Sequence, residues 1–188
     1  MTPRELIDFM AKAEKLKANL RHSWLSDGRQ ESVAEHSWRL SLMVLLTKEW
    51  FPAADMERVL KMAVLHDLGE AVTGDIPAFH KTERDREEER QALRRLLKTL
   101  PDSLNHELTA LFDEMEALET EESKICHALD KLECLMQHNE ADLSSWLPLE
   151  RELNLTYAKE AVSFSPCLQM LDEEICRDSL RKMAQDQK

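Results

Sequence analysis

Residues 65–77, LHDLGEAVTGDIP, decide how we interpret the rest of the chain. The stretch places a histidine, three acidic residues and two glycines directly after an apolar helical run. His66 and Asp67 are neighbours at the expected end of that helix, where the last carbonyl groups favour a bound cation. Glu70 follows one helical turn after His66, on the same side. This spacing predicts a metal site with a further acid beside it.

The composition of the 188-residue chain favours helix almost throughout. There are only 3 glycines and 6 prolines, and leucine, alanine, glutamate, lysine and methionine, which form helices readily, are abundant. We therefore expect an all-α helical bundle that forms one domain over residues 1–188. Its metal-binding helices should span about residues 30–140, and helices at about 148–186 should complete the core or make a subunit contact.

Charge and cysteine usage restrict the partners and the compartment. A formal net charge of −12 argues against polynucleotide binding, which needs a basic face. A small anionic substrate remains compatible where a metal ion and arginines reverse the local charge. The four cysteines show no C-x-x-C spacing and we see no secretory signal, so we expect a reduced, cytoplasmic protein. No apolar run approaches membrane-spanning length.

Two helices are expected before the central stretch. Residues 3–20 show amphipathic spacing that should cover the core. A capping box formed by Ser32 and Glu35 should open a second helix that runs to about Trp50. His36 falls on the apolar side of this helix, where a histidine needs a partner. Alone, such a residue is more often a hydrogen-bonded core histidine than a metal ligand.

In the segment between these helices, residues 21–31 with the sequence RHSWLSDGRQE, helical periodicity fails, and Ser26, Asp27 and Gly28 predict a turn. Its Arg21, His22 and Trp24 have two interpretations. The arginine is solvated and the tryptophan packs the loop down, or the three side chains face a phosphate and a sugar or base. Composition alone favours the first interpretation.

The chain after the central stretch carries one more candidate ligand. Asp130 lies among leucines in a helix expected from Thr120 to about His138. A carboxylate buried there costs several kcal/mol unless it is paired, protonated or bound to a cation. His127 lies on nearly the same face and is a candidate extra ligand, although a hydrogen-bonded or exposed histidine is the more usual interpretation.

The remaining helices are expected to serve packing. Asp55 should cap the helix that leads to His66, and Asp102 or Ser103 should cap a later one. Residues 81–99 carry many acidic and basic residues at three- and four-residue spacing, which is typical of a solvent-exposed helix. Beyond residue 148 we see no candidate site residue.

His36, His66, Asp67 and Asp130 together form a set of two imidazoles and two carboxylates from three helices. Such a set, without thiolates, suits one divalent ion such as Mn, Co, Fe, Ni, Zn or Mg, with coordination positions left for water and substrate. An ion there would lower the pKa of its water and bind a phosphoryl oxygen.

These motifs resemble the HD-domain phosphohydrolase superfamily. The histidine lies in ESVAEHSWRL, the His-Asp pair in VLHDLGEAVTGDIP and the later aspartate in ALDKLE, in recognisable order over about residues 12–140. Within that superfamily the chain is similar to the YfbR-type 5′-deoxynucleotidases and the HD-domain-containing-2 proteins. The resemblance implies an all-helical, usually dimeric enzyme with one divalent metal. Its reaction would be attack of metal-bound water on the phosphate of nucleoside 5′-monophosphates, with deoxynucleotides favoured.

The resemblance also assigns roles to individual positions. It makes the two histidines and two aspartates of the set the metal ligands, Glu70 the catalytic glutamate and Asp75 a second acid near the attacking water. Arg21 matches a phosphate-binding arginine. The deoxynucleotidases carry a tryptophan directly after that arginine, whereas this chain has His22 there and Trp24 two positions further on. The preference between deoxyribose and ribose therefore stays open.

Three alternatives remain at this point. An HD-type di-iron oxygenase would need further histidines in a second motif, which His80, His106, His127 and His138 do not form. A non-catalytic metal-binding or nucleotide-binding HD protein would have little use for both Glu70 and Asp75. A plain helical interaction module would leave the buried histidine and aspartate unexplained. We expect a small nucleotide substrate, no polynucleotide or membrane partner, and a homodimer.

Overall fold

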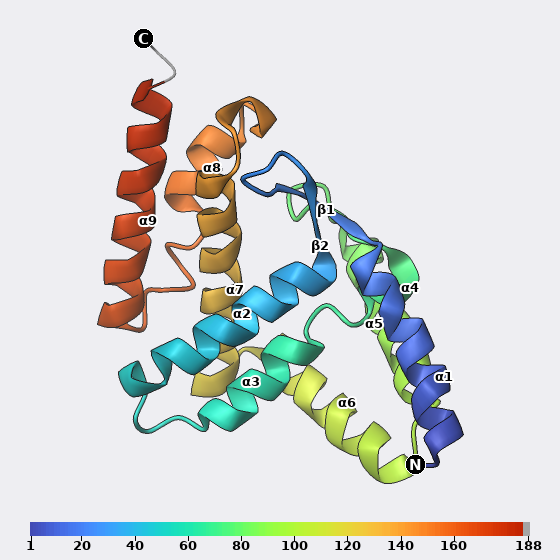
Figure 1. The fold of residues 1–188 in the computed structure, drawn as a ribbon. Helices are drawn as coiled ribbons and strands as arrows, with labels where there is room; N and C mark the ends of the chain where they lie inside the picture. Colours follow the sequence, from blue (N-terminus) through green and yellow to red (C-terminus); the bar gives the residue numbers. More distant parts are fainter. Residues whose placement is uncertain (186–188) are drawn as a thin grey trace.

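The computed structural model of the chain describes residues 1–185, and all of its larger elements are α-helices (Figure 1). This confirms the predicted all-α class. The α-helices are α1 (Pro3–Ala13), α2 (Val33–Thr47), α3 (Met56–Leu65), α4 (Glu70–Thr73), α5 (Glu83–Leu97), α6 (Asp102–Ala117), α7 (Glu121–Glu140), α8 (Glu150–Thr156) and α9 (Pro166–Gln185). Short 3-10 helices are η1 (Glu14–Lys17), η2 (Lys48–Trp50) and η3 (Leu143–Ser145). No helix within residues 1–185 combines the length and apolarity needed to cross a membrane.

Helix α7 lies at the centre and packs against α2, α3, α6 and α9 (Figure 1). Leu129 and Leu132 of α7, Leu40 of α2 and Met62 of α3 are fully buried in one cluster, which also includes Leu168 of α9. Burial of each such side chain contributes roughly 1.5–3 kcal/mol. The same packing brings the ends of α2 and α3 to the middle of α7.

Residues 20–32 form a β-hairpin: the turn predicted at Ser26, Asp27 and Gly28 is confirmed, whereas the two strands that flank it were not predicted. Strand β1 (Leu20–Trp24) pairs antiparallel with β2 (Gln30–Ser32), and the turn lies between them. Gly28, within that turn, has a φ of 87°, a conformation that favours glycine. Part of the segment is buried, so its backbone polar groups need partners, and strand pairing supplies them.

The predicted helix caps are present with one exception. The capping box at Ser32 is present, and the predicted cap Asp55 accepts a backbone N–H bond. Thr120, where a helix was expected to begin, also accepts one and is the N-cap of α7. The cap predicted at Asp102 or Ser103 is wrong, because α6 begins one residue earlier, after Pro101, and its N-terminus has no side-chain cap.

Helix α1 covers the core only in part. Phe9 and Ala13 pack against the core cluster, but no residue of α1 is buried. Leu6, Ile7 and Met10 are 44%, 55% and 56% exposed, because the helix contacts the rest of the molecule along one narrow edge.

Candidate metal centre and substrate pocket

The metal-binding set predicted from the sequence converges where α2, α3 and α7 meet. His36 lies in the first turn of α2, whose start is fixed by the capping box at Ser32. His66 is the residue that ends α3, and Asp67 follows it directly. Asp130 projects from the middle of α7. The side chain of His36 is fully buried, whereas that of Asp130 is 29% exposed and faces the pocket described below.

Four side-chain atoms of this set lie close together. The two Nε2 atoms of His36 and His66 are 3.2 Å apart. Asp130 Oδ1 lies 3.0 Å from the first and 3.8 Å from the second of these nitrogens. Asp67 Oδ2 lies 3.9 Å from His36 Nε2 and 3.1 Å from His66 Nε2.

These separations fit one shared ion. Ligand atoms that lie about 2.1 Å from an ion at angles of about 90–135° are roughly 3.0–3.9 Å from one another. The tautomers support the same conclusion. His36 Nδ1 donates to Glu133 Oε2 at 2.5 Å, and His66 Nδ1 donates to the Ala63 carbonyl at 2.9 Å. In neutral rings both Nε2 lone pairs then face each other, an arrangement that requires a cation or a proton between them.

The acids around His36 favour its protonated, positively charged form. Burial lowers the pKa of His36, but hydrogen bonds to Asp130 and Glu133 outweigh it and raise the pKa to about 10. Burial likewise opposes ionisation of Asp67, yet neighbouring His66 and Arg21 hold the pKa of Asp67 well below its usual range. The centre is therefore built to keep positive charge between ionised carboxylates, as a divalent ion would supply.

Arg21 of β1 lies beside the metal-binding set and faces the pocket. Its Nη1 is 3.4 Å from Asp67 Oδ2, its Nε is 3.3 Å from Glu31 Oε2 and its Nη2 contacts Cys134 Sγ at 2.9 Å. Its side chain is only 14% exposed. Arg21 is thus held by other residues rather than solvated, which favours the second interpretation of this segment.

Glu70 and Asp75 also line the pocket. Glu70 is 3% exposed, and its Oε2 has no hydrogen-bond partner among the described residues. Burial and the charges of Asp67 and Asp75 raise the pKa of Glu70 to about 9, although Lys81 Nζ lies 3.7 Å from its Oε1. Burial also raises the pKa of Asp75. Lys81 in turn forms an ion pair with Glu89 of α5.

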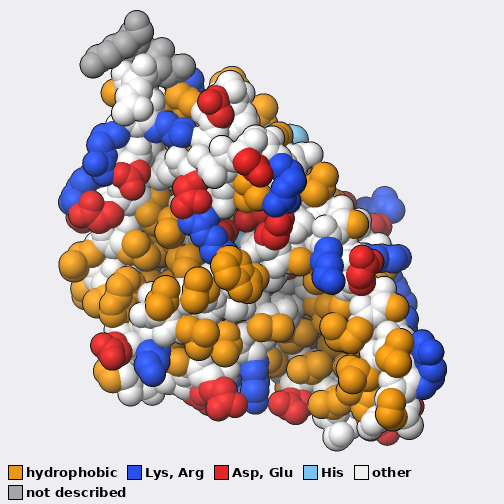
Figure 2. All heavy atoms as spheres, in the orientation of Figure 1, with side chains coloured by type: hydrophobic (Ala, Val, Ile, Leu, Met, Phe, Trp, Pro, Cys, Tyr) orange, Lys and Arg blue, Asp and Glu red, His pale blue; other side chains and the backbone are white. Residues whose placement is uncertain are grey.

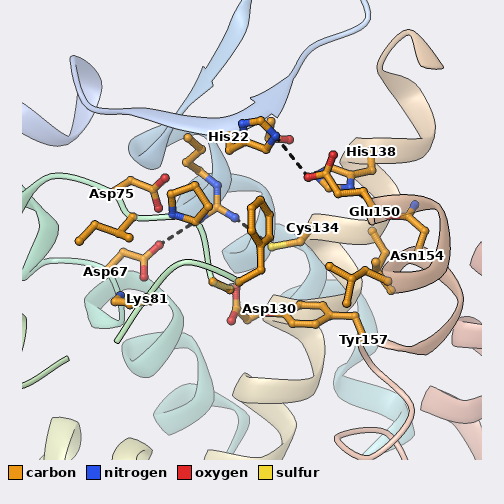
Figure 3. A pocket seen from close by; sticks show the side chains of 18 of the residues that line it. His22, Asp67, Asp75, Lys81, Asp130, Cys134, His138, Glu150, Asn154 and Tyr157 are labelled. Carbon is orange, nitrogen blue, oxygen red and sulfur yellow. Dashed lines mark hydrogen bonds and ion pairs between the residues drawn. The ribbon is translucent and has the colours of Figure 1, made fainter. Parts of the chain in front are cut away.

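The pocket has a volume of about 440 Å³ and opens from this centre. That volume lies within the usual range for small-molecule sites. Asp67, Asp75 and Lys81 lie at one side, and His138, Glu150 and Asn154 lie at the other (Figure 3). Phe79, Leu153 and Tyr157 contribute the apolar part of the wall.

The two remaining predicted substrate residues differ in position. His22 lines the pocket. Trp24 does not belong to the wall, but its ring packs edge-on against His22, with the centroids 4.9 Å apart. His127 lines the pocket but belongs to none of the clusters of potential ligand atoms found in residues 1–185, and burial lowers its pKa.

Sequence reasoning missed two buried acids of this centre. Glu133 is fully buried and holds His36, and Glu31 is 1% exposed and holds Arg21. Burial, together with the charge of Glu133, raises the pKa of Glu31 to about 7. Glu133 could have been found, because it lies three residues after Asp130 and so shares its helix face. Glu31 carried no such signal.

Comparisons with known proteins agree with this geometry. A family model described as HD domain matches residues 13–171. The chain is 34% identical over 142 residues to the 5′-deoxynucleotidase HDDC2 of Bos taurus, covering 73% of this chain and 68% of the relative. It is 28% identical to a 5′-deoxynucleotidase of Yersinia pestis, covering 92% of this chain and 98% of the relative.

A solved structure shares the fold over nearly its full length. It is the structure of a protein described as a predicted metal-dependent phosphohydrolase, from Magnetospirillum magnetotacticum MS-1, and it matches with a TM-score of 0.80. The two sequences are 30% identical, and the match covers 95% of each chain.

Proposed function

The chain belongs to the HD domain family, and on that basis we propose that it is a metal-dependent phosphohydrolase that removes the 5′-phosphate from nucleoside monophosphates, deoxynucleotides among them. The observation that carries the proposal is the convergence of two imidazole nitrogens and two carboxylates at the end of a pocket that also contains a fixed arginine. The 5′-deoxynucleotidases among its relatives supply the substrate class.

His36, His66, Asp67 and Asp130 would hold the metal ion. When bound, a divalent ion at this place supplies a Lewis acid and a water molecule of lowered pKa. Glu133 and the Ala63 carbonyl fix the two imidazole rings through their Nδ1 protons, so both Nε2 atoms point inward.

Arg21 would bind the phosphate. Its guanidinium lies 3.4 Å from Asp67 and is held from behind by Glu31, so it reaches the pocket without a change of rotamer. A guanidinium can donate two parallel hydrogen bonds to a phosphoryl group and neutralises charge as the phosphorus is attacked. The substrate therefore needs a phosphate that can approach Asp67 and Arg21 together.

Glu70 would handle the proton of the attacking water. Its Oε2 lies in the pocket wall without a partner and is free to accept that proton. Asp75 lies on the same wall and would orient the water from a second direction. A divalent ion bound beside Asp67 would offset the carboxylate charge that raises the pKa of Glu70, and would thereby favour the carboxylate form of Glu70.

The nucleoside would occupy the rest of the pocket. His22 presents its ring there, supported edge-on by Trp24 on one side and by Phe79 at 5.8 Å on another. Tyr157 and Leu153 offer apolar surface for a flat base or a sugar. His22 would thus contact the substrate directly, and Trp24 would support it by holding the His22 ring in place.

We also propose that the chain forms one HD domain over residues 1–188 and acts as a homodimer. Apolar side chains gather on the face that contains α2 (Figure 2). Trp38, Leu42, Leu45 and Leu46 of that helix are 67%, 39%, 53% and 72% exposed. Contiguous apolar surface of this kind marks protein contacts. The Leu46→Glu variant should be monomeric by light scattering, and a monomeric parent protein would overturn this assignment.

The test of the activity uses protein stripped of metal with a chelator. Each divalent ion is then restored separately, and phosphate release is followed from deoxynucleoside and ribonucleoside 5′-monophosphates and from phenyl phosphate. We expect at least one ion to restore hydrolysis of a nucleoside monophosphate. If no ion restores hydrolysis of any of these esters, the proposed function is wrong.

A second variant separates catalysis from metal binding. Glu70→Ala should lose turnover while its metal content equals that of the parent protein. Glu83→Ala, a change of the same kind at an exposed position that begins α5, is the matched control and should keep turnover. Turnover that survives in Glu70→Ala would assign the proton transfer to another group.

A further inference from the structure

A buried acid lies in the pocket wall opposite the metal centre. Glu150, the first residue of α8, is 2% exposed. Its Oε2 accepts a hydrogen bond from the Leu147 backbone N–H at 2.6 Å. Its Oε1 has no hydrogen-bond partner among the described residues, although the residue lines the pocket. A buried carboxylate oxygen without a donor is costly, so this atom is prepared for a ligand that brings one.

The neighbours of that oxygen do not satisfy it. His22 Nε2 lies 3.4 Å away but makes no hydrogen bond, and His138 Nε2 lies 3.9 Å away. His138 Nδ1 lies 2.9 Å from Asn154 Oδ1. Asn154 Nδ2 donates to Asn139 Oδ1 and to Ser179 Oγ, which fixes the orientation of the Asn154 amide.

The orientation of that amide determines the tautomer of His138. Because Asn154 Oδ1 can only accept, His138 Nδ1 is the donor, and in the neutral ring Nε2 carries a lone pair. Glu150 Oε1 and His138 Nε2 are therefore two acceptors on the same pocket wall without a donor between them. A ligand hydroxyl or amino group can satisfy either atom or bridge both.

We propose that Glu150 Oε1, together with His138 Nε2, binds a hydrogen-bond donor on the nucleoside part of the substrate and selects nucleotides by it. This inference rests on the proposed function, which places the phosphate at Asp67 and Arg21. Glu150 and His138 lie across the pocket from Asp67 (Figure 3), where the other end of a nucleotide would be. The donor is either a sugar hydroxyl or an amino group of the base.

Glu150→Gln is the variant that tests this assignment. The glutamine amide oxygen can still accept from the Leu147 N–H, so the local backbone bond is kept. The other oxygen, Oε1, is replaced by an amide nitrogen. This nitrogen is a hydrogen-bond donor and cannot accept the hydrogen bond that the substrate would donate. Glu152→Gln removes the same charge from an exposed position of the same helix and is the matched control.

The readout is the ratio of kcat/KM for a nucleotide to kcat/KM for phenyl phosphate, which has no nucleoside donor. Loss of a hydrogen bond to a charged acceptor should lower this ratio about tenfold to a hundredfold in Glu150→Gln. Glu152→Gln should leave the ratio unchanged. The inhibition constant of the free deoxynucleoside, which does not depend on phosphate chemistry, should rise by the same factor in Glu150→Gln.

Substrate analogues distinguish the two donors. A 2′,3′-dideoxynucleoside monophosphate lacks the sugar 3′-hydroxyl, and 2′-deoxypurine riboside monophosphate lacks the 6-amino group of deoxyadenosine monophosphate. For the analogue that lacks the bound donor, kcat/KM should be the same in the parent protein and in Glu150→Gln. For the other analogue, kcat/KM should fall in Glu150→Gln by the full tenfold to hundredfold.

Two results would overturn the inference while the proposed function stands. In one, Glu150→Gln keeps both the specificity ratio and the inhibition constant of the parent protein. In the other, activity on nucleotides and on phenyl phosphate falls by the same factor together with the melting temperature, which would make Glu150 a structural residue of α8. If instead the parent protein hydrolyses phenyl phosphate but no nucleotide, the proposed function is wrong and this inference is wrong with it.

Discussion

Replacing Glu133 by glutamine should weaken metal binding although Glu133 is not itself among the proposed ligands. Its carboxylate accepts the Nδ1 proton of His36 at 2.5 Å, and both side chains are fully buried. Glutamine can still accept that proton, so the ring stays oriented. The substitution removes the negative charge of Glu133, which makes the Nε2 lone pair of His36 a stronger ligand for the ion.

The magnitude follows from the kind of hydrogen bond that is changed. A bond to an ionised partner contributes roughly 1.5–3 kcal/mol, against about 1 kcal/mol for a neutral one. The difference of about 1.4 kcal/mol corresponds to a factor of about 10 in affinity. Because both groups are excluded from water, the loss can reach the 100-fold upper end seen for residues that support metal ligands. The loss of metal affinity is measured by calorimetric titration of the metal-free parent protein and the metal-free variant with Mn²⁺ or Co²⁺.

Glu140→Gln is the matched control for that variant. Glu140 lies on the same helix and contacts the same arginine, with its Oε1 2.6 Å from Arg39 Nη2, whereas Glu133 Oε1 lies 3.6 Å from Arg39 Nε. Glu140 is half-exposed, and within residues 1–185 its side chain pairs with Arg39 and not with His36. A Glu133→Gln variant that binds metal as tightly as the parent protein, or an equal loss of metal affinity in both variants, would refute this role for Glu133.

Three further outcomes are expected. In the metal-free chain, Glu70 holds a proton in the folded state between its ordinary pKa of 4.5 and about 9, while the unfolded chain has lost it. Stability therefore falls as pH rises through that window, on the order of 1 kcal/mol per pH unit, and urea unfolding of Glu70→Gln should show a weaker dependence between pH 5 and 8. Gly69→Ala should lower the free energy of unfolding by about 1–3 kcal/mol, because the added Cβ would lie 2.9 Å from Glu89 Cγ. An unchanged free energy of unfolding would show that Glu89 and α5 can shift away from the new methyl group without cost. Arg21→Lys should reduce kcat/KM for nucleoside monophosphates about tenfold or more with metal content retained, since an ammonium group lacks the paired donors of guanidinium; equal activity would remove the arginine from phosphate binding.

The sequence was most informative where function depends on local chemistry. The capping box at Ser32 sets the start of α2, and His36 then lies one turn inside it. The His66–Asp67 pair was placed correctly at the end of α3, since periodicity ends there. The apolar neighbours of Asp130 indicated a carboxylate that needs a cation, and the structure brings its Oδ1 to 3.0 Å from His36 Nε2.

Features that depend on distant packing were missed. The β-hairpin exists because two segments with weak strand character satisfy each other's backbone, which neither shows alone. Glu31 and Glu150 are ordinary acids by sequence, and only the packing of β2 and α8 onto the pocket buries them. The tail beyond residue 148 carried no recognisable motif, yet α8 contributes Glu150, Leu153 and Asn154 to the pocket wall.

The central claim is that one divalent ion is held by His36, His66, Asp67 and Asp130. Anomalous diffraction from crystals grown with Mn²⁺ tests it most directly. We expect one strong peak about 2.0–2.3 Å from His36 Nε2, His66 Nε2 and one oxygen of each aspartate. A peak between Glu31 and Glu133 instead, or no peak within reach of both histidines, would contradict it.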